Sequence, residues 1–205
     1  MITSNACKIY FYLPALAVLL LLSKSPTNAF GNAPEKIDTD MKVLFEFTGA
    51  EPSPEWSATN DTVMGGVSKG KAELTKVGMD FSGHLSLENN GGFASVHTGV
   101  DLDLSDYSGI RLKVLGDGRI YQVRFESDAL YRQRWPVSFC GDFETVDGEW
   151  IEVFISFSEF SQTWRGRRLA GHRFSKNDIR RIAFMLADGQ AGDFALKVAW
   201  IHAAY

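Results

Sequence analysis

Cysteine is scarce in this 205-residue chain, which contains only Cys7 and Cys140. Cys7 lies in an N-terminal segment that we expect to be separate from the folded domain, which leaves Cys140 without a partner inside it. A single cysteine cannot form an internal disulfide, so the fold must depend on its buried core. Aromatic residues make up 13% of the chain, and their large side chains can supply such a core without cross-links.

The sequence also lacks the usual spacing of a zinc site. The four histidines are never three or four residues from one another or from a cysteine. The glycine-rich segments 65–66 and 116–118 precede predicted strands, whereas a phosphate-binding loop presents its amides at the start of a helix. We therefore predict a protein that is not an enzyme, with no cofactor and no metal ligands. A structural calcium ion near the aspartates of segment 101–106 remains an alternative.

An excess of basic residues is missing as well. The chain has 21 Lys and Arg against 25 Asp and Glu, a net charge of −4. A cluster of arginines and lysines between Arg165 and Arg181 is the exception, and it is typical of a solvated surface. Nucleic-acid binders usually carry a clear basic excess on one face, so we predict no nucleic-acid partner.

One long apolar run is present, at the N-terminus. Residues 9–22 contain no charged side chain, follow Lys8, and precede the small and polar residues 23–29. This order is typical of a secretory signal peptide, predicted here as residues 1–29 with cleavage after Ala29. The run is shorter than the roughly 20 residues of a full membrane span. The sequence thus predicts export to the periplasm or cell envelope, with an uncleaved anchor at residues 9–22 as the alternative.

The rest of the chain alternates between apolar and polar residues at a period of two. A flexible lead-in is expected at residues 30–41, followed by one domain at 42–205. Alternation of this kind places one set of side chains on each face of a strand. The clearest runs are separated by turn residues such as Asp147-Gly148 and Asp188-Gly189, and they lie at residues 43–47, 110–114, 121–125, 151–155, 182–186 and 194–200. This pattern predicts an all-β sandwich or barrel.

Two long strings carry a resemblance to a known family. They are Asn60-Asp61-Thr62-Val63-Met64-Gly65-Gly66-Val67-Ser68 and Glu88-Asn89-Asn90-Gly91-Gly92-Phe93-Ala94-Ser95-Val96. With Trp56, segment 116–121, Trp150 and Arg165-Gly166, they make residues 44–205 resemble the complex I intermediate-associated protein 30 family. The resemblance implies a galactose-binding-like jelly-roll β-sandwich. It also implies a chaperone-like factor that binds protein partners while NADH:ubiquinone oxidoreductase, a membrane complex, is assembled.

The predicted binding residues are polar or aromatic side chains in or beside the expected loops. Carboxylates, amides and a guanidinium suit peptide or hydroxyl-rich ligands, whereas Trp with Arg is typical of protein-binding hot spots. An alternative is that these residues only stabilise turns or cover the sandwich. A second functional hypothesis is a carbohydrate-binding module-like domain that binds a glycan. The candidate residues are Asp61, Asn89, Asn90, Asp117, Arg119 and Tyr121, expected in one polar patch, together with Trp135, Trp164 and Arg165.

Overall fold

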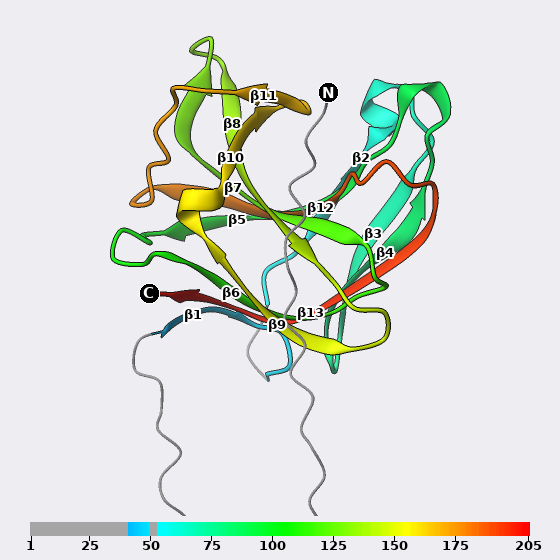
Figure 1. The fold of residues 1–205 in the computed structure, drawn as a ribbon, viewed down its shortest axis with the longest axis horizontal. Helices are drawn as coiled ribbons and strands as arrows, with labels where there is room; N and C mark the ends of the chain where they lie inside the picture. The colour runs from blue at the N-terminus through cyan, green and yellow to red at the C-terminus, as the bar shows by residue number, and fades with distance from the viewer. Residues whose placement is uncertain (1–40, 50–52) are drawn as a thin grey trace, which may run out of the picture. The chain divides into compact units, whose positions relative to one another are not determined.

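The computed structural model describes residues 41–49 and 53–205, which form two antiparallel sheets packed face to face (Figure 1). The first sheet has the order β3 (Lys69–Thr75), β4 (Gly78–Leu85), β13 (Gly192–Ala204), β6 (Gly109–Leu115) and β9 (Trp150–Ser156). Strand β1 (Met41–Glu46) pairs with the second half of β13. The second sheet has the order β11 (Arg167–Leu169), β10 (Ser161–Trp164), β8 (Trp135–Glu144), β7 (Ile120–Tyr131), β12 (Ile179–Leu186), β5 (Ala94–Leu102) and β2 (Ser57–Asn60).

Alternation along the strands explains why the two sheets pack together. In β7, Tyr121, Val123 and Phe125 are fully buried, whereas the residues between them are only partly covered. Facing residues of the first sheet, such as Phe81 on β4, complete a core rich in aromatic rings. The predicted all-β sandwich is therefore confirmed.

Within residues 41–49 and 53–205, three short 3-10 helices lie in the connections between strands: η1 (Asp61–Met64), η2 (Glu88–Asn90) and η3 (Phe157–Glu159). The first two coincide with the two sequence strings, so the resemblance rests largely on loops at one end of the second sheet. Strand β1 begins at Met41, the last residue of the predicted lead-in.

The predicted signal segment 1–29 and the remainder of the lead-in lie outside the described residues. The part of the chain that the structure describes contains no helix with the length and hydrophobicity of a membrane span.

Candidate functional site

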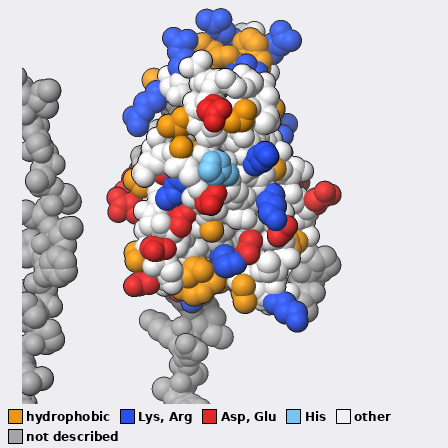
Figure 2. All heavy atoms as spheres, turned by 90° about the vertical axis from the view of Figure 1, so that its right-hand side faces the viewer, with side chains coloured by type: hydrophobic (Ala, Val, Ile, Leu, Met, Phe, Trp, Pro, Cys, Tyr) orange, Lys and Arg blue, Asp and Glu red, His pale blue; other side chains and the backbone are white. Residues whose placement is uncertain are grey.

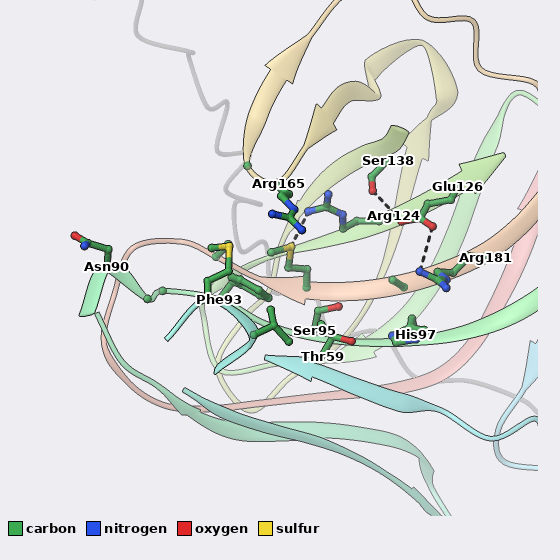
Figure 3. A pocket seen from close by; sticks show the side chains of 18 residues that line it. Thr59, Asn90, Phe93, Ser95, His97, Arg124, Glu126, Ser138, Arg165 and Arg181 are labelled. Carbon is green, nitrogen blue, oxygen red and sulfur yellow. Dashed lines mark hydrogen bonds and ion pairs between the residues drawn. The ribbon is translucent and has the colours of Figure 1, made fainter. Parts of the chain in front are cut away.

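A cavity of about 480 Å³ lies on the outward face of the second sheet (Figure 3). Its floor is formed by alternate residues of neighbouring strands, because the inward residues between them belong to the core. Strand register fixes two rows across this floor, one through His97, Ala183 and Arg124 and the next through Arg181, Glu126 and Ser138. The cavity is thus built on the sheet and is not formed by loops alone.

The charged side chains on the floor are held by neighbours. Arg181 lies 3.2 Å from Glu126, which also accepts a hydrogen bond from the Ser138 hydroxyl at 3.2 Å. Arg124 donates to Thr163 Oγ1 at 2.9 Å and contacts the sulfur of Met185 at 2.6 Å. Figure 3 shows Arg124, Glu126, Ser138 and Arg181 along one side of the cavity. Cross-strand pairing of this kind holds these side chains in fixed positions on the floor of the cavity.

His97 lies on β5, next to the edge strand β2, and is partly buried. Burial lowers its pKa below the ordinary value, and the nearby positive charge of Arg181 lowers it further, against the opposing effect of Glu126. The imidazole is therefore neutral at pH 7 and presents one donor and one acceptor to a ligand.

Two loops wall the cavity at one end, and Asp61 joins them. Its buried carboxylate accepts hydrogen bonds from the Ser68 amide at 2.9 Å, the Ser68 hydroxyl at 2.5 Å and the Gly92 amide at 2.7 Å. Burial alone would raise the pKa of Asp61, but these hydrogen bonds outweigh it and hold the pKa below its usual value. Asp61 thus positions the wall of the cavity from behind and does not face a ligand.

Ser68 deserves comparison with a serine nucleophile, because segment 66–70 matches the pattern G-x-S-x-G. In hydrolases that pattern places an exposed serine on a turn between a strand and a helix. Here Ser68 is fully buried, precedes strand β3, and donates its hydroxyl proton to Asp61 while accepting from the Ser86 amide at 2.9 Å. The motif is therefore a structural element of the loop.

Asp117, Arg119 and Tyr121 belong to a second hydrogen-bond network. The Tyr121 hydroxyl donates to both carboxylate oxygens of Asp117, at 3.1 and 3.0 Å, and Asp117 also accepts from the Ala195 amide at 2.8 Å. Arg119 forms a two-point ion pair with Asp188, at 2.9 and 2.7 Å. This network fastens the β6–β7 connection to the β12–β13 connection.

The pKa directions agree with a structural role for the second network. Burial raises the pKa of the Tyr121 hydroxyl well above its usual value, and the Asp117 carboxylate adds to the effect. Burial also opposes ionisation of Asp188, but the guanidinium of Arg119 outweighs it and lowers the pKa of that carboxyl. Of the six polar residues expected in one patch, Asp61 thus belongs to the first network and Asp117, Arg119 and Tyr121 to the second, with Asp61 and Tyr121 fully buried.

The remaining predicted residues lie near the cavity or beyond its rim. Asn89 and Asn90 are exposed in η2, and Asn90 lines the cavity. Arg165 lines it from the opposite wall, in the turn between β10 and β11. Trp135 and Trp164 lie farther along the same hairpins, with ring centroids 5.2 Å apart. Of the nine predicted residues, Asn90 and Arg165 reach the cavity.

Sequence reasoning missed the floor of the cavity. The alternating run at residues 121–125 predicts a strand there but gives no reason to single out Arg124 or Glu126 as binding residues. The sequence does show that Arg124 and Glu126, two residues apart, place charged side chains of opposite sign on the same face of one strand. Pairing with Arg181 and His97 depends on strand register, which one sequence does not reveal. Among residues 41–49 and 53–205, no group of three or more His, Cys, Asp or Glu side chains gathers into a metal site.

Comparison with curated proteins gives mitochondrial relatives. The mouse protein named complex I intermediate-associated protein 30, mitochondrial, is 27% identical over 187 residues, which cover 82% of this chain and 57% of the mouse protein. The Drosophila melanogaster protein of that name is 24% identical over 188 residues, covering 81% of this chain and 64% of the relative. The chain therefore spans less than two thirds of the length of these relatives.

These names overturn the predicted periplasmic or envelope location, including its membrane-anchored variant, and point to mitochondria. The prediction depended on the apolar run at 9–22, and hydrophobicity by itself does not specify the destination membrane. The first acidic residue of the chain is Glu35. A lack of acidic residues is also typical of mitochondrial targeting segments.

Solved structures with a similar fold are carbohydrate-binding modules. The family 11 module of cellulase Lic26A-Cel5E from Clostridium thermocellum superposes with a TM-score of 0.62 at 17% identity, covering 80% of this chain and 95% of the module. A family 11 module from the same organism, in complex with a β-1,3-1,4-mixed-linked tetrasaccharide, gives a TM-score of 0.61 at 18% identity, with the same coverage. These likenesses confirm the galactose-binding-like jelly-roll fold.

The family itself is established by a model match over most of the described domain. Residues 45–198 match the model for complex I intermediate-associated protein 30, and both sequence strings lie inside that range. The chain belongs to the complex I intermediate-associated protein 30 (CIA30) family.

Proposed function

We propose that this chain is a non-catalytic binding domain that associates with intermediates in complex I assembly. It holds a segment of a protein partner, in the manner of a chaperone, in the cavity of the second sheet. The observation that carries the proposal is the preformed cavity on a rigid sheet, in a chain that belongs to the CIA30 family. Ion-paired floor residues such as Arg181 and Glu126 are arranged to recognise a ligand through hydrogen bonds.

The lining suits an extended peptide. Arg124, Arg181 and Glu126 offer charged donors and acceptors, while Met64, Phe93 and Met185 supply apolar contact area. Ligand sites commonly combine apolar walls with a few polar groups that fix orientation. Methionine adapts its shape to different apolar partners, which suits a factor that releases its partner after assembly.

The test is affinity purification of the tagged full chain from mitochondrial membranes of the cells that make it. Complex I subunits in the eluate are identified by mass spectrometry. Ser95→Trp fills the cavity floor and is expected to remove these subunits. Ser82→Trp, an identical change on an outward position of β4 in the other sheet, is the matched control and is expected to retain them. Equal recovery with both variants would contradict the cavity as the binding site.

A glycan is the second candidate ligand, and the hydroxyls of Thr59, Ser95 and Ser138 in the lining favour it. Sugar sites usually stack the ring of a sugar on an aromatic side chain, and Phe93 offers such a ring here. Binding of the protein to a glycan array, with loss of that binding in Phe93→Ala, would support this function. An array on which the protein binds no glycan would contradict the glycan-binding function.

A further inference from the structure

Two tight hairpins meet at one end of the second sheet, above the cavity. The β7–β8 turn has Arg132 and Gln133 at φ of 50° and 56°, and the β10–β11 turn has Arg165 and Gly166 at 47° and 74°. Trp164 pairs with Arg167 across a two-residue loop, whereas three residues separate the paired Tyr131 and Trp135. Tight turns with two consecutive left-handed residues match the twist of the strands. Figure 1 shows both hairpins reaching the same end of the sandwich, at the top of the view. Side chains on these turns are therefore presented on a rigid support.

The hairpins are joined by aromatic rings. Trp164 lies between Tyr131 and Trp135, with ring centroids 5.0 and 5.2 Å away. Each of the three rings carries an arginine over it, at 5.3 to 5.4 Å from guanidinium carbon to ring centroid. We call this surface the arginine–aromatic tip. It consists of Tyr131, Arg132, Arg134, Trp135, Trp164, Arg165, Arg167, Arg168 and Arg173.

The charge of the tip is not neutralised by the protein. Segments 129–141 and 160–177 contain no Asp or Glu. Within the described residues, none of the guanidinium groups of the tip makes a hydrogen bond or an ion pair. Other surface cations do pair with carboxylates, for example Lys71 with Glu73 at 2.6 Å and Lys197 with Asp80 at 2.5 Å. The tip is thus a concentrated positive patch on a protein of net negative charge.

Figure 2 shows Lys and Arg side chains gathered around hydrophobic ones at this same end of the molecule. Near the β7–β8 turn, Leu130 of β7 is 45% exposed. Tryptophan and tyrosine are enriched where a membrane meets water, because one end of each ring system is apolar and the other polar. Arginine adds attraction to acidic headgroups while its alkyl stem lies along apolar surface.

We infer that the arginine–aromatic tip docks on an anionic lipid membrane surface. Charge complementarity is the main argument, since six unpaired guanidinium groups match an array of headgroups. They lie on the two turns, on β11 and on the connection that follows it. Arg165 lines the cavity of the second sheet, but the other eight residues of the tip lie outside that lining, so most of the tip is open surface and not the wall of the cavity. Docking by this end would place the cavity of the second sheet next to the membrane. Recognition of lipid does not depend on the function proposed above.

Vesicle co-sedimentation of the full chain tests the inference. The vesicles are phosphatidylcholine alone or phosphatidylcholine with phosphatidylglycerol. Arg132→Asn with Arg134→Gln removes two charges of the tip at residues outside the cavity lining, and asparagine tolerates the left-handed conformation of position 132. Each arginine near an anionic surface contributes about a fivefold increase in binding, so the double variant is expected to bind about 25-fold more weakly. Trp164→Ala is expected to weaken binding further.

The control is Lys71→Gln with Lys113→Gln, an equal loss of charge from exposed side chains of the first sheet. All variants keep the apolar N-terminal run, so the difference between them isolates the tip. Weaker binding of the tip variant alone, abolished by salt, supports the inference. Equal binding by both double variants overturns it. If vesicle binding is unchanged while the tip variant loses complex I subunits in purification, the tip binds an acidic protein surface and the inference is also overturned.

Partner binding in the cavity and lipid docking by the tip can be tested independently. Ser95→Trp is expected to abolish recovery of complex I subunits and to leave vesicle binding intact, because Ser95 lies on the cavity floor and outside the tip.

Discussion

The Asp61 carboxylate accepts a hydrogen bond of 2.7 Å from the backbone amide of Gly92, 31 residues away. This bond joins the two sequence strings that define the resemblance to the CIA30 family. One buried carboxylate thus holds the loop backbone of both strings in place, through Ser68 of the first string and Gly92 of the second. The cavity wall formed by η1, η2 and the residues that follow them depends on this contact.

Asp61→Asn is expected to lower the free energy of unfolding by about 3 kcal/mol, because a buried charged acceptor is replaced by an amide. The single oxygen of the asparagine amide cannot accept hydrogen bonds from the Ser68 amide, the Ser68 hydroxyl and the Gly92 amide together. Its NH2 group would also face some of these donors. Urea denaturation followed by circular dichroism measures the change. Asp128→Asn, at an exposed position, is the control and should lie within about 0.5 kcal/mol of the wild type.

The pH dependence of stability provides a separate test of Asp61. Its folded-state pKa is lowered, so below pH 4 the unfolded chain binds a proton there more readily than the folded one. The contribution of Asp61 is therefore complete above its unfolded pKa of about 3.9 and is lost as the pH falls toward the folded value. The gap in unfolding free energy between wild type and Asp61→Asn should narrow in that range. A gap that stays constant down to pH 2 would argue against an ionised, hydrogen-bonded Asp61.

Gly66 tests how closely the loop backbone approaches the same carboxylate. A Cβ at this position would lie 2.4 Å from the Cγ of Asp61, well inside van der Waals contact. Gly66→Ala is expected to cost about 1–3 kcal/mol by overpacking. Gly99→Ala is the matched control, because a Cβ there meets no atom within 4 Å and its φ is not positive. Thermal melts of the two variants should differ clearly, and similar melting temperatures would contradict the close approach.

Much of the fold follows from periodicity in the sequence. Tyr121, Val123 and Phe125 alternate with polar residues, and burial of this set requires only that a second sheet cover one face. The position of β13 between β4 and β6 does not follow, because it depends on pairing between segments more than 70 residues apart. Which distant strands pair depends on how all the core side chains pack together. The residue types within one strand carry little information about its partner.

The site was harder to predict than the fold. Asp61, Asp117 and Arg119 have side chains suited to ligands, but the same chemistry satisfies backbone groups in long connections. In this protein these three side chains bond to groups in or beside the connections and are not free to bind a ligand. Arg124 and Glu126 reach the cavity because their strand is central and their positions face outward. Both sets of residues are polar in the sequence. Only strand register and burial distinguish the buried residues of the connections from the residues that line the cavity.

Arg119 and Asp188 provide the last prediction, since their side chains are only 10% and 5% exposed. Arg119→Met is expected to lower the free energy of unfolding by about 3–5 kcal/mol, because it leaves the Asp188 carboxylate buried without its cation. Arg119→Met with Asp188→Leu should recover most of that loss, since both charges are then replaced by apolar groups. Denaturant unfolding of the two single variants and the double variant measures the coupling. Additive effects would show that the pair does not act as a unit, whereas strong coupling with unchanged recovery of complex I subunits would assign Arg119 to stability alone.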